Sequence, residues 1–344
     1  MSEIEILQAG LLTTVQDRGR IGYQKFGMPV AGVMDSRAYE IGQWLVGNAS
    51  MVGALECTLL GPTFICDGDL VLAITGADMK PKKNGIPFPN WTAIRCKAGD
   101  EIALGATTIG VRTYVSFFGG ITVPVINGSV STYVKSGIGG YKGRKLKSGD
   151  RLDIQKSTED TILLMLPPEK IPEYDMDGPV RVVLGPQDCA FTKKGIETFF
   201  HKDGYVITPA SDRMGYRLNG TAIEHTDKAD IISDGAVFGS IQVPANGEPI
   251  ILMADRQTTG GYTKIGTVIS VDLPRLAQMA IEQRIVFKQV SIAESQVIYR
   301  EDRRRHRQRL SACVPVPVFA AQRVSRRLQI TIKGQTYKVV VSED

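Results

Sequence analysis

The chain has 344 residues, 43% of them hydrophobic, and a formal net charge of +5. This size and composition suit a well-packed globular protein of about two domains. The positive charge is local, because residues 300–309 contain six arginines and two acidic residues, a local charge of +4. The rest of the chain is close to neutral, so the distributed basic surface of a nucleic-acid-binding protein is not expected.

The cysteines and the N-terminus indicate the compartment. The five cysteines form no Cys-x-x-Cys pair and are odd in number, which favours reduced thiols. The opening sequence MSEIEILQAG lacks the apolar run of a signal peptide, and no membrane-spanning segment is expected. We therefore expect a cytoplasmic protein without membrane contact. The three histidines are isolated from potential co-ligands, so no metal site is expected in this chain.

Short apolar runs that end in turn residues dominate the sequence and predict β-strands. The clearest runs lie at residues 69–77, 100–106, 112–120 and 161–168. Gly-Asp pairs, which suit tight turns, precede strands at residues 99–100 and 149–150. This pattern favours a β-barrel or sandwich over alternating strands and helices.

Only a few short helices are expected. The first covers residues 34–48, with Asp35 or the following serine as N-cap, and the second begins at Asp188. Asp272 is expected to cap the third helix. Residues 291–294, SIAE, form a capping box that opens a helix containing the arginine-rich segment.

The segment PPEKIPEYDMDGP, with four prolines, is the predicted linker between domains. It divides the chain into an N-terminal β-barrel subdomain, residues 1–175, and a C-terminal subdomain, residues 176–290. Residues 291–344 are expected to form the basic helix and a C-terminal hairpin that turns at Lys333-Gly334. The hairpin is similar to the first strands of biotin-carrier domains, but no Met-Lys-Met site follows it.

Two glycine-rich loops carry polar side chains. In residues 13–35, Asp17 and Arg20 lie among glycines, so the loop either presents an arginine and backbone N–H groups to an anion or is pinned by a structural ion pair. Residues 125–146 combine hydroxyl groups with glycines, and predict either a mobile flap over a ligand or a loop without a binding role.

Two further polar clusters follow in the second half of the chain. In residues 209–220, Arg213 and Arg217 could hold a carboxylate, or Asp212 could pair with an arginine to fix the turn. The richest cluster follows the apolar strand at residues 250–253. Polar groups at the end of a buried strand must be hydrogen-bonded or face a cavity. We therefore predict a ligand site there, formed by Asp255, Arg256, Gln257, Thr258, Thr259, Gly260, Gly261 and Tyr262, with Gln242 from a neighbouring strand.

Five long motifs, found in order between about residues 7 and 287, resemble one family. They read LLTTVQDRGRIGYQKFGMPVAGVMD, GGITVPVINGSVST, GRKLKSGDRL, SDRMGYRLNG and GSIQVPANGEPIILMADRQTTGGYTKIGTVISVDL. The resemblance is to the allophanate hydrolase subunit 2-like family. This family includes the 5-oxoprolinase C subunits, also called KipI antagonists (KipA), and part of the carboxyltransferase domain of urea amidolyase.

The resemblance implies a mainly β fold with two cyclophilin-like β-barrel subdomains and a few short helices. It implies two protein partners, one KipI-like and the other LamB/YcsF-like. The expected activity is the ATP-dependent conversion of 5-oxo-L-proline to L-glutamate by the assembled complex. One alternative is a biotin-dependent carboxyltransferase, for which biotin is the cofactor. The other is a non-enzymatic, KipA-like antagonist of a KipI-type kinase inhibitor.

The resemblance also suggests roles for the residues of the site. ATP-dependent activation of a lactam needs cations and N–H donors around developing negative charge. Arg256 and Arg213 are expected to bind carboxylate or phosphate, and Asp255 to act as a base or face Mg²⁺. Thr258, Thr259 and Gly260 are expected to donate to an oxyanion, with Asp17, Arg20 and Arg217 in the same cleft. ATP and Mg²⁺ are expected to be shared with the KipI-like partner.

Overall fold

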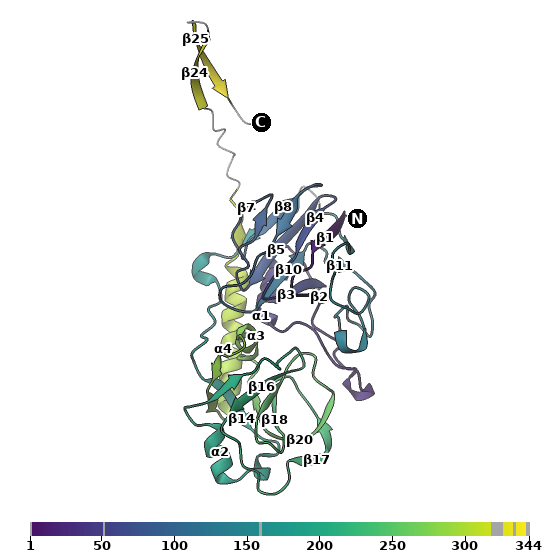
Figure 1. Cartoon of the computed structure of the whole chain (residues 1–344), viewed down its shortest axis with the longest axis vertical. Helices are drawn as coiled ribbons and strands as arrows, with labels where there is room; N and C mark the ends of the chain where they lie inside the picture. The colour runs from purple at the N-terminus through teal and green to yellow at the C-terminus, as the bar shows by residue number, and fades with distance from the viewer. Residues whose placement is uncertain (1, 51, 158–159, 318–325, 333–334, 342–344) are drawn as a thin grey trace.

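The structure is a computed structural model that describes residues 2–50, 52–157, 160–317, 326–332 and 335–341. It is mainly β, which confirms the predicted fold class, and two β-rich domains lie one above the other (Figure 1). Most N-terminal core residues come from residues 4–166 and most C-terminal core residues from 180–287. The predicted boundary at residue 176 lies between these two groups.

Two facing sheets build the N-terminal domain, and their strand orders are β11-β12-β1-β4-β9-β6-β7 and β2-β3-β10-β5-β8. The first sheet contains β1 (Ser2–Gln8), β4 (Thr63–Cys66), β6 (Lys82–Lys83), β7 (Ile86–Pro87), β9 (Glu101–Ala103), β11 (Ile121–Thr122) and β12 (Arg151–Ile154). The second contains β2 (Leu12–Gln16), β3 (Ala54–Thr58), β5 (Leu70–Gly76), β8 (Ala93–Cys96) and β10 (Arg112–Phe117). Phe64 and Phe117, one from each sheet, meet edge-on with ring centroids 6.1 Å apart.

Helix α1 (Ser36–Leu45) covers the outer face of the second sheet, so β5 and β10 are buried on both faces. Its N-cap is Asp35, whose carboxylate accepts a hydrogen bond from the backbone N–H of Ala38, as the sequence predicts. The buried face of α1 places Tyr39, Ile41 and Leu45 against the sheet.

A single curled sheet forms the C-terminal domain, in the order β21-β15-β16-β19-β18-β20-β14-β22, with β17 paired to β20. The two end strands are separated in the chain by Val286 alone, which means that the sheet curls back on itself into a nearly closed barrel. Its strands are β14 (Val180–Leu184), β15 (Tyr205–Ile207), β16 (Gly215–Gly220), β17 (Asp230–Gly235), β18 (Ser240–Val243), β19 (Ile250–Leu252), β20 (Thr259–Val268), β21 (Arg284–Ile285) and β22 (Phe287–Gln289).

The predicted start of the second helix is wrong. Residues Asp188–Ala190 form a separate 3₁₀ turn, and α2 (Lys193–Phe199) begins only after Thr192. The hydroxyl of Thr192 accepts from the backbone N–H of Gly195 at 2.9 Å and so supplies the cap. Three further 3₁₀ turns lie at Gln24–Phe26, Val134–Ser136 and Pro168–Lys170.

Helix α3 (Leu273–Gln278) begins after Asp272, as predicted, but the Asp272 carboxylate does not cap it. This carboxylate instead accepts from the backbone N–H and the guanidinium of Arg181, at 2.8 Å and 3.0 Å from Oδ2. The residue thus joins α3 to β14.

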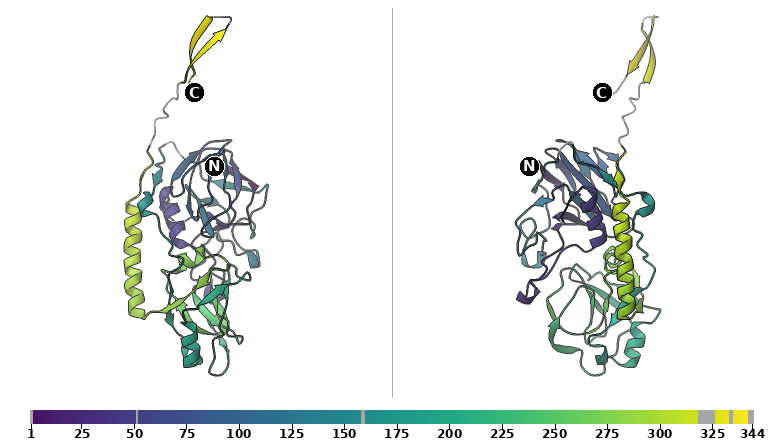
Figure 2. Two further views of the ribbon diagram at one scale, coloured as in Figure 1. Left: turned by 60° about the vertical axis from the view of Figure 1, so that its left-hand side comes forward. Right: turned by 180° about the vertical axis from the view of Figure 1, so that it is seen from behind.

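Helix α4 (Ile292–Ser311) runs along the outside of both domains (Figure 2). It opens with the predicted capping box between Ser291 and Glu294. After it, β23 (Val314–Pro315) pairs with β13 (Leu164–Met165). The predicted C-terminal hairpin is present as β24 (Arg326–Ile332) and β25 (Gln335–Val341), paired antiparallel, while the predicted turn at 333–334 lies outside the described residues.

Contacts between Glu40 and two side chains of α4 attach this helix to α1. His306 Nε2 lies 2.9 Å from Glu40 Oε2, and Arg303 lies 3.3 Å from the same oxygen. Burial alone raises the pKa of Glu40, but the hydrogen bond and charge of His306, with Arg303 and Arg18, lower it to about 2. Arg37 of α1 and Asp302 of α4 form a second pair at 2.9 Å.

The contacts of Glu40 with His306 and Arg303, here called the clamp, predict a pH dependence of the unfolding free energy. The folded-state pKa of Glu40 lies below its ordinary 4.5, so its contribution is complete above pH 4.5 and is lost as the pH falls toward about 2. Between pH 5 and 2, the wild type should lose about 2–3 kcal/mol more unfolding free energy than Glu40→Gln, measured by urea denaturation. Glu197→Gln, which removes an exposed acid, should follow the wild type. Parallel pH curves for Glu40→Gln and wild type would exclude the clamp.

Candidate functional site

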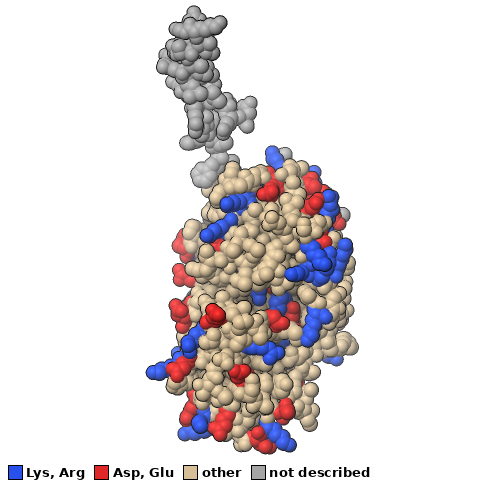
Figure 3. Space-filling view, in the orientation of Figure 1, with Lys and Arg blue, Asp and Glu red and all other residues tan. Residues whose placement is uncertain are grey.

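A buried ion cluster joins the two domains through Arg213. Its Nε and Nη2 donate to both oxygens of Asp255, at 3.0 Å and 2.9 Å, within the C-terminal domain. Its Nη1 donates to Glu56 of the N-terminal domain, and Nη2 also reaches the carbonyl of Gly32 at 2.6 Å. All three charged side chains are nearly inaccessible to solvent. Figure 3 shows charged atoms of both signs in the hollowed middle of this face, between the domains.

The pKa values follow from this pairing. Burial lowers the pKa of Arg213, but the charges of Asp255 and Glu56 outweigh it and hold the pKa well above its ordinary value. Burial raises the pKa of Asp255, partly offset by Arg213. All three guanidinium nitrogens of Arg213 donate to acceptors within the chain, and both Asp255 oxygens accept from Arg213. These contacts favour a structural role for the pair over the expected roles in binding and catalysis.

Further hydrogen bonds extend the cluster into both domains. Glu56 Oε2 accepts from the Tyr114 hydroxyl at 2.7 Å and from the Met34 N–H at 2.8 Å. The same Tyr114 hydroxyl accepts from the Asp35 N–H at 2.7 Å. The side chain of Gln278, on α3, donates to Asp35 Oδ2 at 2.8 Å. The network therefore links the cap of α1 in one domain to α3 in the other.

Asp17 pins the two glycine-rich loops together. Its carboxylate accepts from the Ser129 and Ser131 hydroxyls and from the backbone N–H groups of Gly19 and Val130, the last two at 2.8 Å. Of the two alternatives for this loop, the structure favours the structural one for Asp17, although its partners are serines and backbone rather than Arg20.

Arg20 is fully buried in the same pair of loops. Its Nη2 donates to the carbonyl of Ser131, whereas Nε and Nη1 have no partner among the described residues. Gly139 makes room for it, because an added Cβ would lie 2.1 Å from Nη2. Burial lowers the pKa of Arg20, against the charges of Asp17 and Asp255. Arg20 therefore lies near the ion cluster and retains capacity for a further acceptor.

Arg256 packs inside the C-terminal domain. Its Nε donates to the carbonyl of Ala236 at 3.2 Å, its Nη1 reaches the carbonyl of Met253 at 3.4 Å, and its guanidinium lies 5.8 Å from the Phe238 ring centroid. Burial without an acidic partner lowers the pKa of Arg256 to about 10. The side chain is buried, but it is not among those that line the cavity in the mouth of the C-terminal barrel.

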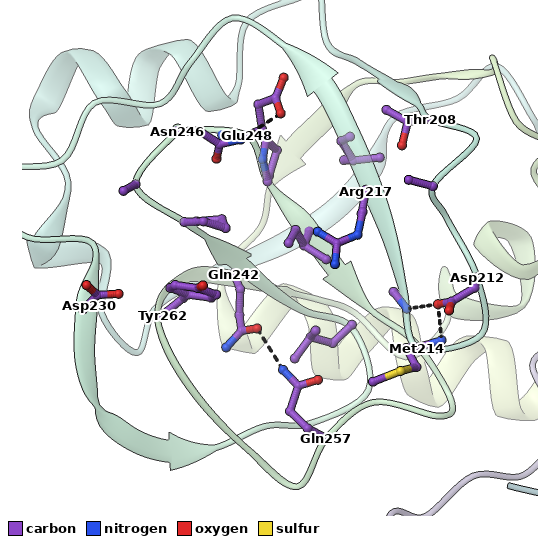
Figure 4. Close-up of a pocket in the computed structure, with 18 of the residues that line it drawn as sticks. Thr208, Asp212, Met214, Arg217, Asp230, Gln242, Asn246, Glu248, Gln257 and Tyr262 are labelled. Atoms are coloured by element: carbon purple, nitrogen blue, oxygen red, sulfur yellow. Dashed lines mark hydrogen bonds between the residues drawn. The ribbon is translucent and has the colours of Figure 1, made fainter. Parts of the chain in front are cut away.

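A cavity of about 910 Å³ opens in the mouth of the C-terminal barrel and brings together four of the predicted residues. They are Arg217 from β16, Gln242 from β18, Gln257 from the turn after β19, and Tyr262 from β20 (Figure 4). Gln257 Nε2 donates to Gln242 Oε1 at 3.1 Å. Arg217 is exposed, and no side-chain partner of it is found in the described part of the chain.

Gln242 is the most constrained of the four. It is 2% exposed, and its Nε2 has no hydrogen-bond acceptor among residues that the structure describes. Gly260 is required beside it, since an added Cβ would lie 2.1 Å from this nitrogen. Gly260 therefore provides space for the amide.

The other predicted residues of this segment lie beside the cavity rather than in its wall. The carbonyl of Thr258 accepts from the Ala236 N–H at 3.0 Å, and the exposed Thr259 begins β20 opposite Gly235. An added Cβ on Gly261 would have nothing closer than 3.6 Å, so no close approach explains that glycine.

The structure adds cavity residues that the sequence does not assign to the predicted ligand site. Lys135 reaches the cavity from the N-terminal domain, with Nζ 3.6 Å from Met214 Sδ. Asp212 caps the turn beside it by accepting from the Met214 N–H at 2.8 Å. Both lie in segments that the sequence marks as polar, but no sequence signal places them together. Four more polar residues line the wall, namely Thr208, Asp230, Asn246 and Glu248.

Neither a metal cluster nor a membrane span is found in the described residues. In the described ranges, no group of three or more His, Cys, Asp or Glu side chains is placed to hold a metal ion. Among the same residues, no helix has the length and apolar character needed to cross a membrane.

Comparison with known proteins identifies relatives over most of the chain. The family described as "Carboxyltransferase domain, subdomain A and B" matches residues 26–289. The chain is 38% identical over 312 residues to the 5-oxoprolinase C subunit of Escherichia coli (strain K12), covering 90% of this chain and 97% of the relative. It is 35% identical over 299 residues to the 5-oxoprolinase C subunit of Haemophilus influenzae, covering 87% and 95%.

Larger yeast proteins contain a similar domain. The structure of Kluyveromyces lactis urea carboxylase matches with a TM-score of 0.83 at 26% identity, over 99% of this chain and 32% of that one. The K. lactis urea amidolyase structure also matches with a TM-score of 0.83, at 28% identity, over 89% of this chain and 20% of that one. The chain thus spans nearly the full length of the bacterial relatives and a minor part of the yeast proteins.

The structural role of Arg213 predicts a contrast with Arg217. Arg213→Met leaves two buried carboxylates without a cation and should lower the unfolding free energy by about 3–5 kcal/mol. Arg217→Met removes an exposed side chain and should change it by less than about 0.5 kcal/mol. Urea denaturation of both variants at pH 7 measures the difference. Equal stability of the two variants would contradict the structural assignment.

Proposed function

The chain belongs to the carboxyltransferase domain family, and on that premise we propose that it is the C subunit of an ATP-dependent 5-oxoprolinase. The complex converts 5-oxo-L-proline to L-glutamate, in the cytoplasm, together with a KipI-like protein and a LamB/YcsF-like protein. Support comes from the two bacterial 5-oxoprolinase relatives, which align over 97% and 95% of their own lengths.

The chemistry of the barrel cavity supports this substrate. 5-Oxoproline is a five-membered lactam with a carboxylate, so it needs amide recognition and a cation. The paired amides of Gln242 and Gln257 offer both donors and acceptors to a lactam. Arg217 is unpaired in the described structure, and its planar fork suits a carboxylate. Lys135 adds a second positive charge at the rim.

One observation carries this assignment. The Nε2 of Gln242 is buried, lacks an acceptor in the described residues, and belongs to a side chain that lines the cavity. A buried amide donor without an acceptor is costly, and a lactam carbonyl would satisfy it. In the proposed mechanism, Gln242 and Gln257 orient the lactam while Arg217 holds its carboxylate. The cavity of about 910 Å³ leaves room beside this small substrate for a group from a partner.

The nucleotide is assigned to a site completed by the partner proteins. ATP supplies the phosphoryl group that activates the lactam carbonyl. Asp255, the expected Mg²⁺-facing group, has both oxygens engaged by Arg213, and no metal-binding cluster lies in the described residues. The residues that the structure describes therefore do not form a complete Mg²⁺ site.

A carboxyltransferase activity is the second candidate, favoured by the likeness to urea carboxylase. The ureido group of biotin also presents N–H donors and a carbonyl acceptor, so the glutamine pair would suit it as well. Transfer of carboxyl from a biotinylated carrier, without 5-oxoproline-dependent ATP turnover, would identify this function. A KipA-like antagonist would instead still bind the KipI-like protein after substitution of the cavity residues Arg217 and Gln242.

Arg217→Gln should raise the KM for 5-oxo-L-proline about 10–100-fold, because it removes a charge-assisted contact with the carboxylate. Gln242→Leu should lower kcat/KM about 100-fold, since the lactam then loses its buried donor. The assay is 5-oxoproline-dependent ATP hydrolysis by the chain reconstituted with its KipI-like and LamB/YcsF-like partners.

Arg284→Gln is the matched control, because this exposed arginine lies on β21 and does not line the cavity. Its kinetics should equal those of the wild type. Wild-type kinetics for Arg217→Gln and Gln242→Leu would remove the cavity from the proposed mechanism.

A further inference from the structure

Helix α4 has two faces with different roles. The face toward α1 carries Asp302, Arg303 and the buried His306, which hold the helix in place. With 3.6 residues per turn, Val297, Arg300, Arg304 and Arg307 fall in one stripe on a second face of the helix. All four are exposed, and Figure 2 shows this helix along the outer edge of the molecule.

The stripe carries positive charge that the described structure does not neutralise. Each acidic residue of α4 is used elsewhere: Glu294 in the capping box, Glu301 with Arg305 at 2.5 Å, and Asp302 with Arg37 at 2.9 Å. In the part of the chain that the structure describes, Arg300, Arg304 and Arg307 form no ion pair or side-chain hydrogen bond.

The charges of these three arginines repel one another on the helix. Like charges three or four residues apart on a helix repel each other and slightly destabilise it. None of the three contributes to the attachment of α4 to α1, which depends on Asp302, Arg303 and His306. Their positions are therefore better explained by a contact outside this chain.

An apolar groove of about 490 Å³ lies beside the stripe, between α4 and the outside of the C-terminal barrel. Val183 of β14 and residues 267–270 form one wall, and Tyr299 and Arg300 of α4 form the other. Arg300 thus belongs to both the groove and the stripe. Tyr299 and Val297 remain 49% and 55% exposed, so apolar surface continues along the first half of the helix.

We propose that the groove and the arginine stripe together dock a partner protein of the complex. The matching partner surface has an apolar side chain that fills the groove and carboxylates that face Arg300, Arg304 and Arg307. This inference rests on the proposed function, because the partner is taken to be another component of the same 5-oxoprolinase. It assigns a role to the basic helix, which the catalytic proposal leaves unexplained.

A protein fits this surface better than a nucleic acid. The stripe from Arg300 to Arg307 is only about 10 Å long and adjoins apolar surface, whereas a phosphate backbone needs a longer basic track. Outside residues 300–309, the chain is nearly neutral. A short basic stripe beside an apolar groove is the arrangement of a protein interface with an apolar centre and a charged rim.

The test uses the full chain with the substitutions Arg300→Glu, Arg304→Glu and Arg307→Glu. Sedimentation and calorimetry measure binding to the purified KipI-like protein and, separately, to the purified LamB/YcsF-like protein. Charge reversal should weaken binding to one of the two by about 100-fold, because like charges then face each other. A triple lysine variant should stay within about 10-fold of the wild type, since it keeps the charge.

The matched control reverses three exposed lysines on another face, with Lys193→Glu, Lys194→Glu and Lys202→Glu. It changes net charge equally and should bind like the wild type. Thermal unfolding of each variant confirms folding. Unchanged assembly and 5-oxoproline turnover in the arginine reversal would overturn the docking surface while the proposed function stands. Loss of assembly in that variant, with no turnover by the wild-type complex, would support docking and overturn the function.

Three other results would overturn this docking proposal. The first is failure of the wild-type chain to bind either partner protein, which would also remove the proposed complex. The second is self-association of the chain that charge reversal abolishes, which makes a second copy the occupant. The third is stripe-dependent binding to a 20-base-pair DNA duplex (probe length about two turns) that is as tight as binding to the partner protein.

Discussion

The contact between Arg213 and the carboxylates of Glu56 and Asp255 fixes the arrangement of the two domains. A buried ion cluster of this kind tolerates little displacement, because each charge depends on its partners for the solvation that burial removes. It holds the segment before β16 against β3, and Tyr114 carries the restraint on to the cap of α1. The loop that contains Lys135 can then reach the mouth of the C-terminal barrel.

This arrangement separates two arginines that lie four residues apart. Arg213 faces the domain boundary, where acceptors within the chain hold it, whereas Arg217 faces the barrel cavity. The ionic interactions at the boundary therefore hold the two domains together. The proposed substrate contacts depend on the exposed guanidinium of Arg217 and on the cavity-lining amides of Gln242 and Gln257.

Local signals in the sequence predict local features well. Asp35 caps α1, residues 291–294 open α4, and the polar run after β19 contributes Gln257 and Tyr262 to a cavity, as expected. Long-range pairing is what the sequence does not show. The partner of Arg213, Glu56, is 157 residues away. From the sequence alone, where that contact cannot be seen, Arg213 and Arg217 have the same expected role.

The contacts of Arg256 could not be predicted from the sequence for the same reason. Arg256 is held by backbone carbonyls and Phe238, and carbonyl positions depend on the folded chain rather than on residue type.

The most direct test of the proposed site is a crystal structure of the assembled complex with 5-oxo-L-proline. We predict the lactam against Gln242 and Gln257 and the carboxylate on Arg217, with Arg213 still bound to Asp255. A ligand seated on Arg213 or Arg256, with the barrel mouth empty, would contradict it.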